Sequence, residues 1–166
     1  MTMNISRKNW IVLAVVLFAV CTLLQAAVVP QAPQTLELKP GWNLVTLEHP
    51  IVDDIEAKSF LALQPMTLDA VAKSYVRCTS LADLKIGAGY WVFAVNEQEI
   101  QLTKDQSQTS WETAALKSDW NLLGVADNSD WQSQAAAIWQ WLNGHFQKIS
   151  ITELTSGEGY WVTPKQ

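Results

Sequence analysis

The sequence predicts an α+β protein: two related strand–helix–strand modules, sheet-rich and packed together, preceded by an N-terminal hydrophobic targeting helix. Three observations carry this prediction. An uncharged apolar run lies near the N-terminus, two short motifs each occur twice in the same order, and aromatic β-type segments alternate with segments typical of helix. The resulting division is a signal peptide or membrane anchor (1–27), an extended spacer (28–35), a first module (36–103), a linker (104–111) and a second module (112–166).

The N-terminal segment is typical of an export signal. Basic residues at positions 7 and 8 precede an apolar run, 10–24, that carries no charge. This arrangement keeps the N-terminus in the cytoplasm and translocates the rest of the chain. Three alternatives stay open: cleavage near 25–27, retention as a membrane anchor of about 20 residues, and lipid modification of Cys21. We expect an exported protein that is periplasmic, at the cell surface or secreted, and that contacts a membrane only through this segment if it is not cleaved.

Two motifs define the repeat. Gly-Trp-Asn-Leu at 41–44 returns as Asp-Trp-Asn-Leu at 119–122. Gly-Ala-Gly-Tyr-Trp-Val at 87–92 returns as Gly-Glu-Gly-Tyr-Trp-Val at 157–162. Both pairs keep their order, which chance matches rarely do, so we predict two related modules.

Each motif predicts a turn followed by a strand. The first leads into strands 42–47 and 120–125, and its repeated Asn is expected to bond to the backbone. The second uses its glycines for positive φ or close backbone approach and then forms strand 90–95 in the first module. The tryptophans that recur at equivalent strand positions are interpreted as core: Trp42, Trp91, Trp120 and Trp161.

The segments between the motifs predict helix and then strand. In the first module, 51–63 is expected to be helical, with acidic residues near its start that suit the helix dipole. A second short helix is expected at 67–72 and a strand at 74–78. In the second module, a residue at 129 or 130 is expected to cap a helix that continues to 137.

A hairpin is the sharpest local prediction. Asn143-Gly144 lies between the β-rich runs 138–142 and 145–149, which favours a type I′ turn. That turn sets a register in which Trp141 lies opposite Phe146 and Trp139 lies opposite Lys148.

The two motifs together resemble a tryptophan-rich repeat module found in bacterial secreted and cell-surface proteins. The first module carries the pattern in full, from Gly41 to Leu44 and from Gly87 to Val92, whereas Asp119 replaces the first glycine in the second. The resemblance covers most of the mature chain and rests on two short motifs. It implies a location and a fold, and it implies no activity.

Composition and motifs argue against several functions. The net charge is −5 and no basic cluster occurs, so we expect no nucleic-acid partner. His49, His145 and Cys78 have no metal-ligand spacing, so neither a metal nor another cofactor is expected. No nucleophile motif and no paired carboxylates stand out. We therefore predict a protein that is not an enzyme and has no catalytic residues.

Tryptophan is the remaining functional signal, with nine in 166 residues. Some have no counterpart in the other module and are candidates for an exposed ligand-binding face: Trp111, Trp131, Trp139 and Trp141. Aromatic rings anchor protein interfaces and also stack on sugars. Two hypotheses result: a non-catalytic module for protein interaction or structure, with an unknown protein partner, and alternatively a carbohydrate-binding module that holds a glycan on exposed tryptophans.

Overall fold

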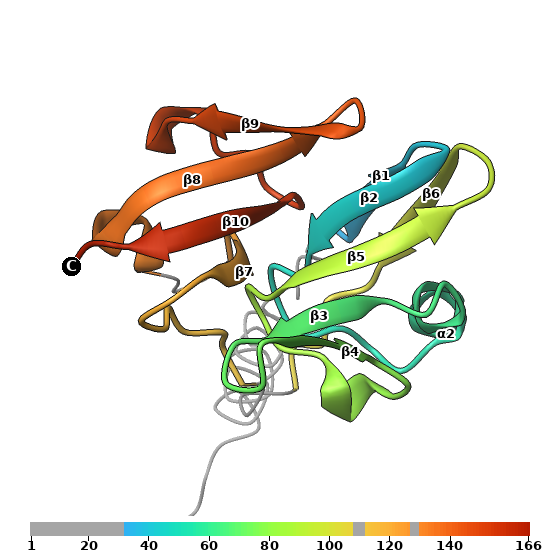
Figure 1. The fold of residues 1–166 in the computed structure, drawn as a ribbon. Coiled ribbons are helices and arrows are strands. Elements are labelled where there is room, and N and C mark those ends of the chain that lie inside the picture. Colours follow the sequence, from blue (N-terminus) through green and yellow to red (C-terminus); the bar gives the residue numbers. More distant parts are fainter. Residues whose placement is uncertain (1–31, 108–111, 127–129) are drawn as a thin grey trace, which may run out of the picture. The chain divides into compact units, whose positions relative to one another are not determined.

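The computed structural model describes residues 32–107, 112–126 and 130–166. These residues belong to one compact unit, Ala32–Gln166 (Figure 1). The predicted targeting segment, 1–27, lies outside the described residues. Within them, ten strands form three sheets and a single α-helix is present, so the fold is mostly β and the α+β prediction is wrong.

None of the helices in the described part of the chain combines the length and the hydrophobicity needed to cross a membrane.

The described unit contains two four-stranded antiparallel sheets with equivalent strand orders. The first sheet has the order β2 (Gly41–Thr46), β5 (Gly89–Ala94), β3 (Met66–Asp69), β4 (Ser74–Arg77). The second has the order β7 (Asn121–Gly124), β10 (Gly159–Pro164), β8 (Ala135–Leu142), β9 (His145–Ile149). Strands β7, β10, β8 and β9 thus occupy the places of β2, β5, β3 and β4. We call the parts of the chain that form these sheets the first and second halves.

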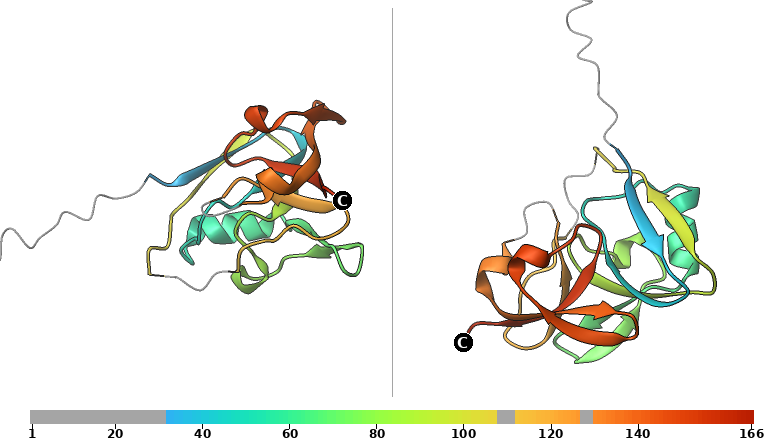
Figure 2. Two further views of the ribbon diagram at one scale, coloured as in Figure 1. Left: turned by 90° about the vertical axis from the view of Figure 1, so that its left-hand side faces the viewer. Right: turned by 90° about the horizontal axis from the view of Figure 1, so that it is seen from above.

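A third, two-stranded sheet belongs to the first half. It pairs β1 (Gln34–Leu38) with β6 (Gln98–Leu102). The only α-helix of the described residues, α2 (Ile55–Ala62), lies beside β6 (Figures 1 and 2). Leu36, Leu38 and Phe60 from these elements join the buried core of the first half.

The repeated asparagines bond to the backbone, as predicted. The Asn43 side chain accepts a hydrogen bond from Lys39 N (2.9 Å) and donates one to Lys39 O (2.8 Å). Asn121 repeats both bonds with Lys117, at 2.7 and 3.0 Å. Each amide therefore closes the turn that leads into the first strand of its sheet.

The two motif tyrosines also make matching bonds. The Tyr90 hydroxyl accepts from Lys85 N (2.6 Å) and donates to Lys85 O (2.9 Å). The Tyr160 hydroxyl makes the same pair of bonds with Thr155, at 2.6 and 3.2 Å. Burial raises the pKa of both hydroxyls, that of Tyr160 to about 12.

Helix α2 is shorter than the helix predicted at 51–63. It begins at Ile55, after Asp54, whose side chain accepts a hydrogen bond from Ala57 N at 2.9 Å. Ile51 is instead extended and forms a bridge with Lys104. The helix therefore starts at its cap residue and not at the first apolar position of the pattern.

The short helix predicted at 67–72 does not form, and the segment is strand β3 followed by a turn. Met66 pairs with Trp91 of β5 as well as with Arg77 of β4, so β3 lies inside the sheet. The carboxylate of Asp69 then accepts hydrogen bonds from the main chain at 71 and 72, which closes the turn. Strand β4 begins at residue 74, as predicted for 74–78.

The helix predicted to continue to 137 is also wrong. Residue 129 lies outside the described part of the chain. Trp131–Gln134 form a single 3₁₀ turn, and β8 begins at Ala135. Three alanines favour helix intrinsically, but pairing of Ala137 with Thr163 of β10 overrides that preference.

The hairpin prediction is confirmed in full. In β8 and β9, Trp141 lies opposite Phe146 and Trp139 opposite Lys148. Asn143 and Gly144 have φ values of 51° and 82°, the positive values that a type I′ turn requires.

The two halves meet through matching main-chain contacts. Thr46 N donates to Gly157 O, and Gly124 N donates to Gly87 O, both at 2.9 Å. Thr46 ends β2 and Gly124 ends the equivalent strand β7, and Gly157 and Gly87 are equivalent motif glycines. The two bonds therefore link equivalent positions in opposite directions between the halves. A Cβ on Gly124 would overlap the Thr46 side chain. Glycine at this position therefore allows the two backbones to approach closely.

Candidate functional site

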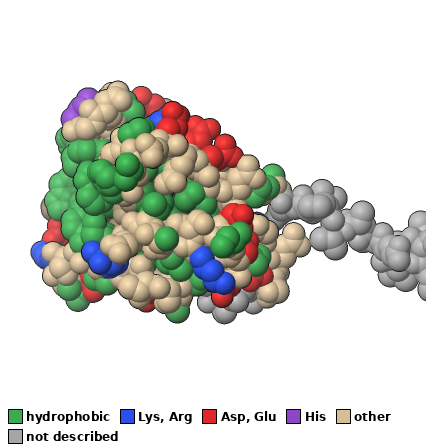
Figure 3. Space-filling view, turned by 90° about the vertical axis from the view of Figure 1, so that its right-hand side faces the viewer, with side chains coloured by type: hydrophobic (Ala, Val, Ile, Leu, Met, Phe, Trp, Pro, Cys, Tyr) green, Lys and Arg blue, Asp and Glu red, His purple; other side chains and the backbone are tan. Residues whose placement is uncertain are grey.

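Most described tryptophans gather where the two halves meet. We define the aromatic seam by eight side chains that lie on the facing strands or just before them: Trp42, Trp91, Phe93, Trp120, Trp139, Trp141, Phe146 and Trp161. Trp91 of the seam also forms a small buried cluster with Leu44 and Leu122, and this cluster joins the two halves. Figure 3 shows hydrophobic side chains gathered toward one side of the unit. Such a concentration of apolar surface is typical of a binding site.

In the first half, the seam is closed over Trp91. The ring of Trp141 meets Trp91 edge to face, with centroids 5.3 Å apart, and Phe146 lies 6.2 Å away. Trp42 contacts Trp91 at 6.3 Å and Phe93 at 5.4 Å, again edge to face. Together these rings leave Trp91 only 9% exposed. Such contacts stabilise the junction beyond simple burial of area.

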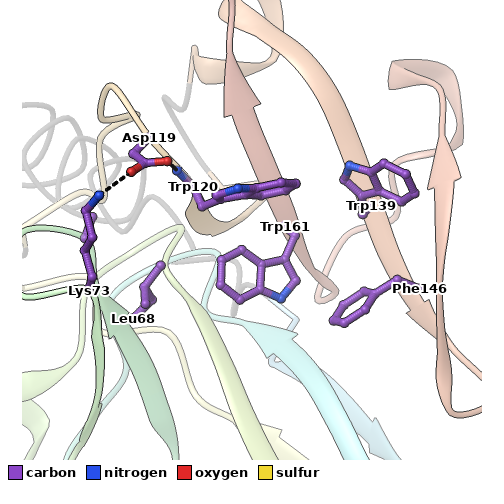
Figure 4. Close-up of a pocket in the computed structure, with 8 residues that line it drawn as sticks. Leu68, Lys73, Asp119, Trp120, Trp139, Phe146 and Trp161 are labelled. Atoms are coloured by element: carbon purple, nitrogen blue, oxygen red, sulfur yellow. Dashed lines mark hydrogen bonds and ion pairs between the residues drawn. The ribbon is translucent and has the colours of Figure 1, made fainter.

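In the second half, the seam is open. Trp120 and Trp161 pack edge to face at 5.8 Å, but Trp120 stays 45% exposed. Beside them is a pocket of about 540 Å³. Figure 4 shows three indoles and a phenyl ring arranged across the second sheet, opposite residues of the first half. The pocket is lined by Leu68, Ala70, Lys73, Asp119, Trp120, Trp139, Phe146 and Trp161.

One ion pair crosses the edge of this pocket. Lys73 Nζ, in the β3–β4 turn, lies 2.7 Å from Asp119 Oδ2, just before β7 (Figure 4). The hydrogen bond from Lys73 lowers the pKa of Asp119 and raises that of Lys73. Both side chains are well exposed, so the pair positions the turn and contributes little to stability.

Trp139 contributes an unusual polar atom to the site. Its indole Nε1 is buried and has no hydrogen-bond partner among the described residues. Figure 4 shows this nitrogen turned toward Trp120 and Trp161. A buried donor without an acceptor is unfavourable, so this N–H lowers the stability of the folded site.

A second cavity, of about 890 Å³, is lined by residues of both halves, among them Trp42 and Trp141. Its lining is mixed, because Trp42 and Trp141 are accompanied by polar side chains such as Asn43, Gln140 and Glu158. Glu158 accepts a hydrogen bond from Gln140 Nε2 at 2.5 Å, which fixes both side chains. This crevice therefore offers aromatic rings together with hydrogen-bonding groups.

The tryptophans singled out from the sequence have different locations. Trp111 lies outside the described residues. Trp131 is 2% exposed and donates its indole N–H to Gly124 O at 2.9 Å, so it is a core side chain. Trp139 and Trp141 both belong to the aromatic seam, where Trp139 lines the pocket and Trp141 lines the crevice.

The repeated tryptophans, interpreted as core, divide into two kinds. Trp91 is buried, and Trp161 is partly buried and lines the pocket. Trp42 and Trp120, each the first aromatic residue after its turn, are nearly half exposed, so the core interpretation is wrong for them. Sequence reasoning missed Trp120, Trp161 and Phe146 as site residues. For Phe146 a signal was available, because the predicted hairpin register already placed it opposite Trp141.

The described residues that line the pocket include no histidine or cysteine. No cluster of three metal-binding side chains occurs in the described part of the chain. Cys78 is buried in the core of the first half, and burial raises the pKa of its thiol to about 11. Cys78 therefore packs as a small apolar residue and does not supply a thiolate to the site.

The fold and site thus define a β-sheet protein with an open aromatic pocket and an adjoining polar crevice. Comparison with protein-family models, with curated proteins and with solved structures yields no match to this chain. The resemblance to the tryptophan-rich repeat module stays a prediction.

Proposed function

We propose that the protein is an exported, non-catalytic binding module and that its aromatic pocket docks an apolar segment of a protein partner. Export is inferred from the sequence of the N-terminal segment. The observation that carries the binding proposal is the pocket lining: three tryptophans and Phe146 face an open cavity in which Lys73 and Asp119 neutralise one another. Rigid aromatic side chains of this kind dominate the energy of protein interfaces.

The charge distribution supports a protein segment as ligand. An anionic ligand would need an unpaired cation at the pocket, but the lining lysine is already paired with Asp119. A sugar would need several donors and acceptors around its ring, whereas the lining is almost entirely hydrocarbon. An apolar side chain needs neither, and burying it contributes about 25 cal/mol for each Å² removed from water.

The test is selection of peptides from a displayed random library on the full-length chain. We expect enriched peptides to carry aromatic or aliphatic residues and to lose at least about tenfold in affinity on Trp161→Ala, since a hot-spot side chain is worth about 2 kcal/mol or more. Ile55→Ala is the matched control, because Ile55 is an exposed apolar residue of α2 outside the pocket. Peptides whose binding is unaffected by Trp161→Ala would overturn the proposal.

A glycan is the second candidate, and the mixed lining of the crevice favours it. Trp42 could stack on a sugar ring while Glu158 accepts hydrogen bonds from its hydroxyl groups. A glycan array probed with the full-length chain tests this candidate. Binding that is lost in Trp42→Ala and retained in Trp120→Ala would place the glycan in the crevice. An array without any bound glycan would rule against this candidate.

A further inference from the structure

The strand pairings relate specific residues of the two halves. Met66 of β3 lies opposite Trp91, and Trp139 of β8 lies opposite Trp161. Two positions further along each strand, Leu68 and Trp141 therefore occupy equivalent places and point to the same side of their sheets as Met66 and Trp139. Leu68 of the first half is thus the structural counterpart of Trp141 of the second.

Trp141 shows the effect of a tryptophan at the position that Leu68 occupies in the first half. Its ring covers Trp91, with centroids 5.3 Å apart. Its indole Nε1 donates a hydrogen bond to the main-chain oxygen of Trp42 at 3.1 Å. Phe146, directly opposite on β9, completes the cover. An indole held in this way closes the seam of the first half.

Leu68 covers Trp161 less completely than Trp141 covers Trp91, because leucine is much smaller than tryptophan. Leu68 lies at the edge of the pocket beside Trp161 and Trp120, and it leaves the cavity of about 540 Å³ open (Figure 4). The turn that follows Leu68 is held by the Lys73–Asp119 ion pair instead of by an indole. The pocket therefore lies where an equivalent of Trp141 would be.

We propose that the pocket accepts a tryptophan side chain presented by an extended segment of a protein partner. This inference rests on the proposed function and names its ligand. The incoming ring packs edge to face on Trp161, as Trp141 does on Trp91. Its N–H is directed to the main-chain oxygen of Trp120, the counterpart of Trp42. An extended segment presents the ring in the way that strand β8 presents Trp141.

The direct test uses N-acetyl-5-fluorotryptophanamide as a probe, observed by ¹⁹F NMR during titration with the full-length chain. We expect saturable binding that is lost in Trp161→Ala and kept in Ile55→Ala. In competition, N-acetyltryptophanamide should displace the probe at about two- to tenfold lower concentration than N-acetylleucinamide, because an aromatic pair adds about 0.5–1.5 kcal/mol to simple burial. N-acetylphenylalaninamide should lie between the two.

The same inference can be tested by placing a tryptophan of the chain itself at the position beside the pocket. Leu68→Trp supplies the missing indole, so it should raise the thermal midpoint of unfolding and abolish probe binding. Ile55→Trp is its matched control, because it adds an indole on α2 outside the pocket and should leave probe binding intact. Loss of probe affinity in both variants, or retained affinity in Leu68→Trp, would overturn the filling argument.

The outcomes separate this inference from the proposed function. Equal displacement by the tryptophan and leucine compounds would overturn the preference for indole and leave apolar docking in place. Selected peptides that bind through Trp161 but lack tryptophan would also overturn the preference for indole and leave apolar docking in place. If neither peptides nor the probe depend on Trp161, the proposed function and this inference both fail.

Discussion

Trp141 donates its indole N–H to the main-chain oxygen of Trp42 at 3.1 Å and thereby joins the hairpin of the second half to the first strand of the first half. The two residues are far apart in sequence, and each belongs to a different sheet. This bond and the ring contact with Trp91 hold the closed part of the aromatic seam. The stability of the junction should therefore depend on the shape of residue 141.

Trp141→Leu should destabilise the protein by about 2–4 kcal/mol, because it removes ring contacts and leaves a cavity over Trp91. It should also open a second apolar pocket that resembles the one beside Leu68. Urea unfolding measures the first effect, and titration with the fluorinated tryptophan probe measures the second. Trp141→Phe is the control, since it keeps one aromatic ring over Trp91 while it loses the hydrogen bond and part of the indole. If the leucine and phenylalanine variants were equally stable, the ring contact would not be what closes the seam.

Gly124→Ala should be among the most damaging glycine changes, because a Cβ there would overlap the side chain of Thr46 at the junction of the halves. We expect a loss of about 2–3 kcal/mol, typical of overpacking in a tight core. Gly144→Ala is the control: it has free space and a φ of 82°, so only backbone strain of about 1 kcal/mol applies. Thermal unfolding of the two variants gives the comparison, and a milder effect at 124 would show that the halves can separate slightly without cost.

Asn121→Ala should cost about 1–3 kcal/mol, because it removes the side-chain bonds to Lys117 and leaves their main-chain partners unpaired. Asn43→Ala breaks the equivalent bonds of a more exposed turn and should cost less. Urea unfolding of both variants measures the order. The reverse order would mean that burial of the amide does not set its contribution.

Stability should fall in alkaline solution because of Tyr90 and Tyr160. Burial raises the pKa of both hydroxyls above the unfolded value of about 10, that of Tyr160 to about 12. The raised pKa favours the neutral form in the folded state, so the stabilisation is complete below pH of about 10 and is lost as the pH rises toward 12. Tyr160→Phe should be less stable at neutral pH, by about 1–2 kcal/mol, and less sensitive to pH above 10.

The measurement is the urea midpoint of wild type and Tyr160→Phe between pH 8 and pH 11.5. Tyr75→Phe is the control, since Tyr75 is nearly half exposed on the edge strand β4. Parallel pH profiles for wild type and Tyr160→Phe would contradict the assignment of the alkaline transition to this hydroxyl.

Local geometry could be predicted from the sequence wherever neighbouring residues set it. The register of the β8–β9 hairpin follows from Asn143-Gly144, whose positive φ values permit one tight turn. The bonds of Asn43 and Asn121 reach only four residues back. Both features depend on short stretches of chain, and both were predicted correctly.

Two helix predictions failed because pairing partners distant in the chain decided the structure. Residues 67–69 and 135–137 have sequences compatible with helix, yet each belongs to a strand that lies between two others. Their partners in β5 and β10 lie many residues further along the chain. Intrinsic preference is worth less than about 1 kcal/mol per residue, so the sheet's hydrogen bonds and packing outweigh it.

The sequence by itself determined the order of the motifs, the hairpin register and the backbone role of the repeated asparagines, because each depends on local conformation. Only the tertiary structure decided which tryptophans are exposed, because that depends on what the opposite half places over them. Trp91 is covered since Trp141 faces it, and Trp161 adjoins an open pocket since Leu68 occupies the counterpart position. Whether tryptophan or leucine stands at these two equivalent positions affects the exposure of the opposite rings only because the two sheets pack against each other.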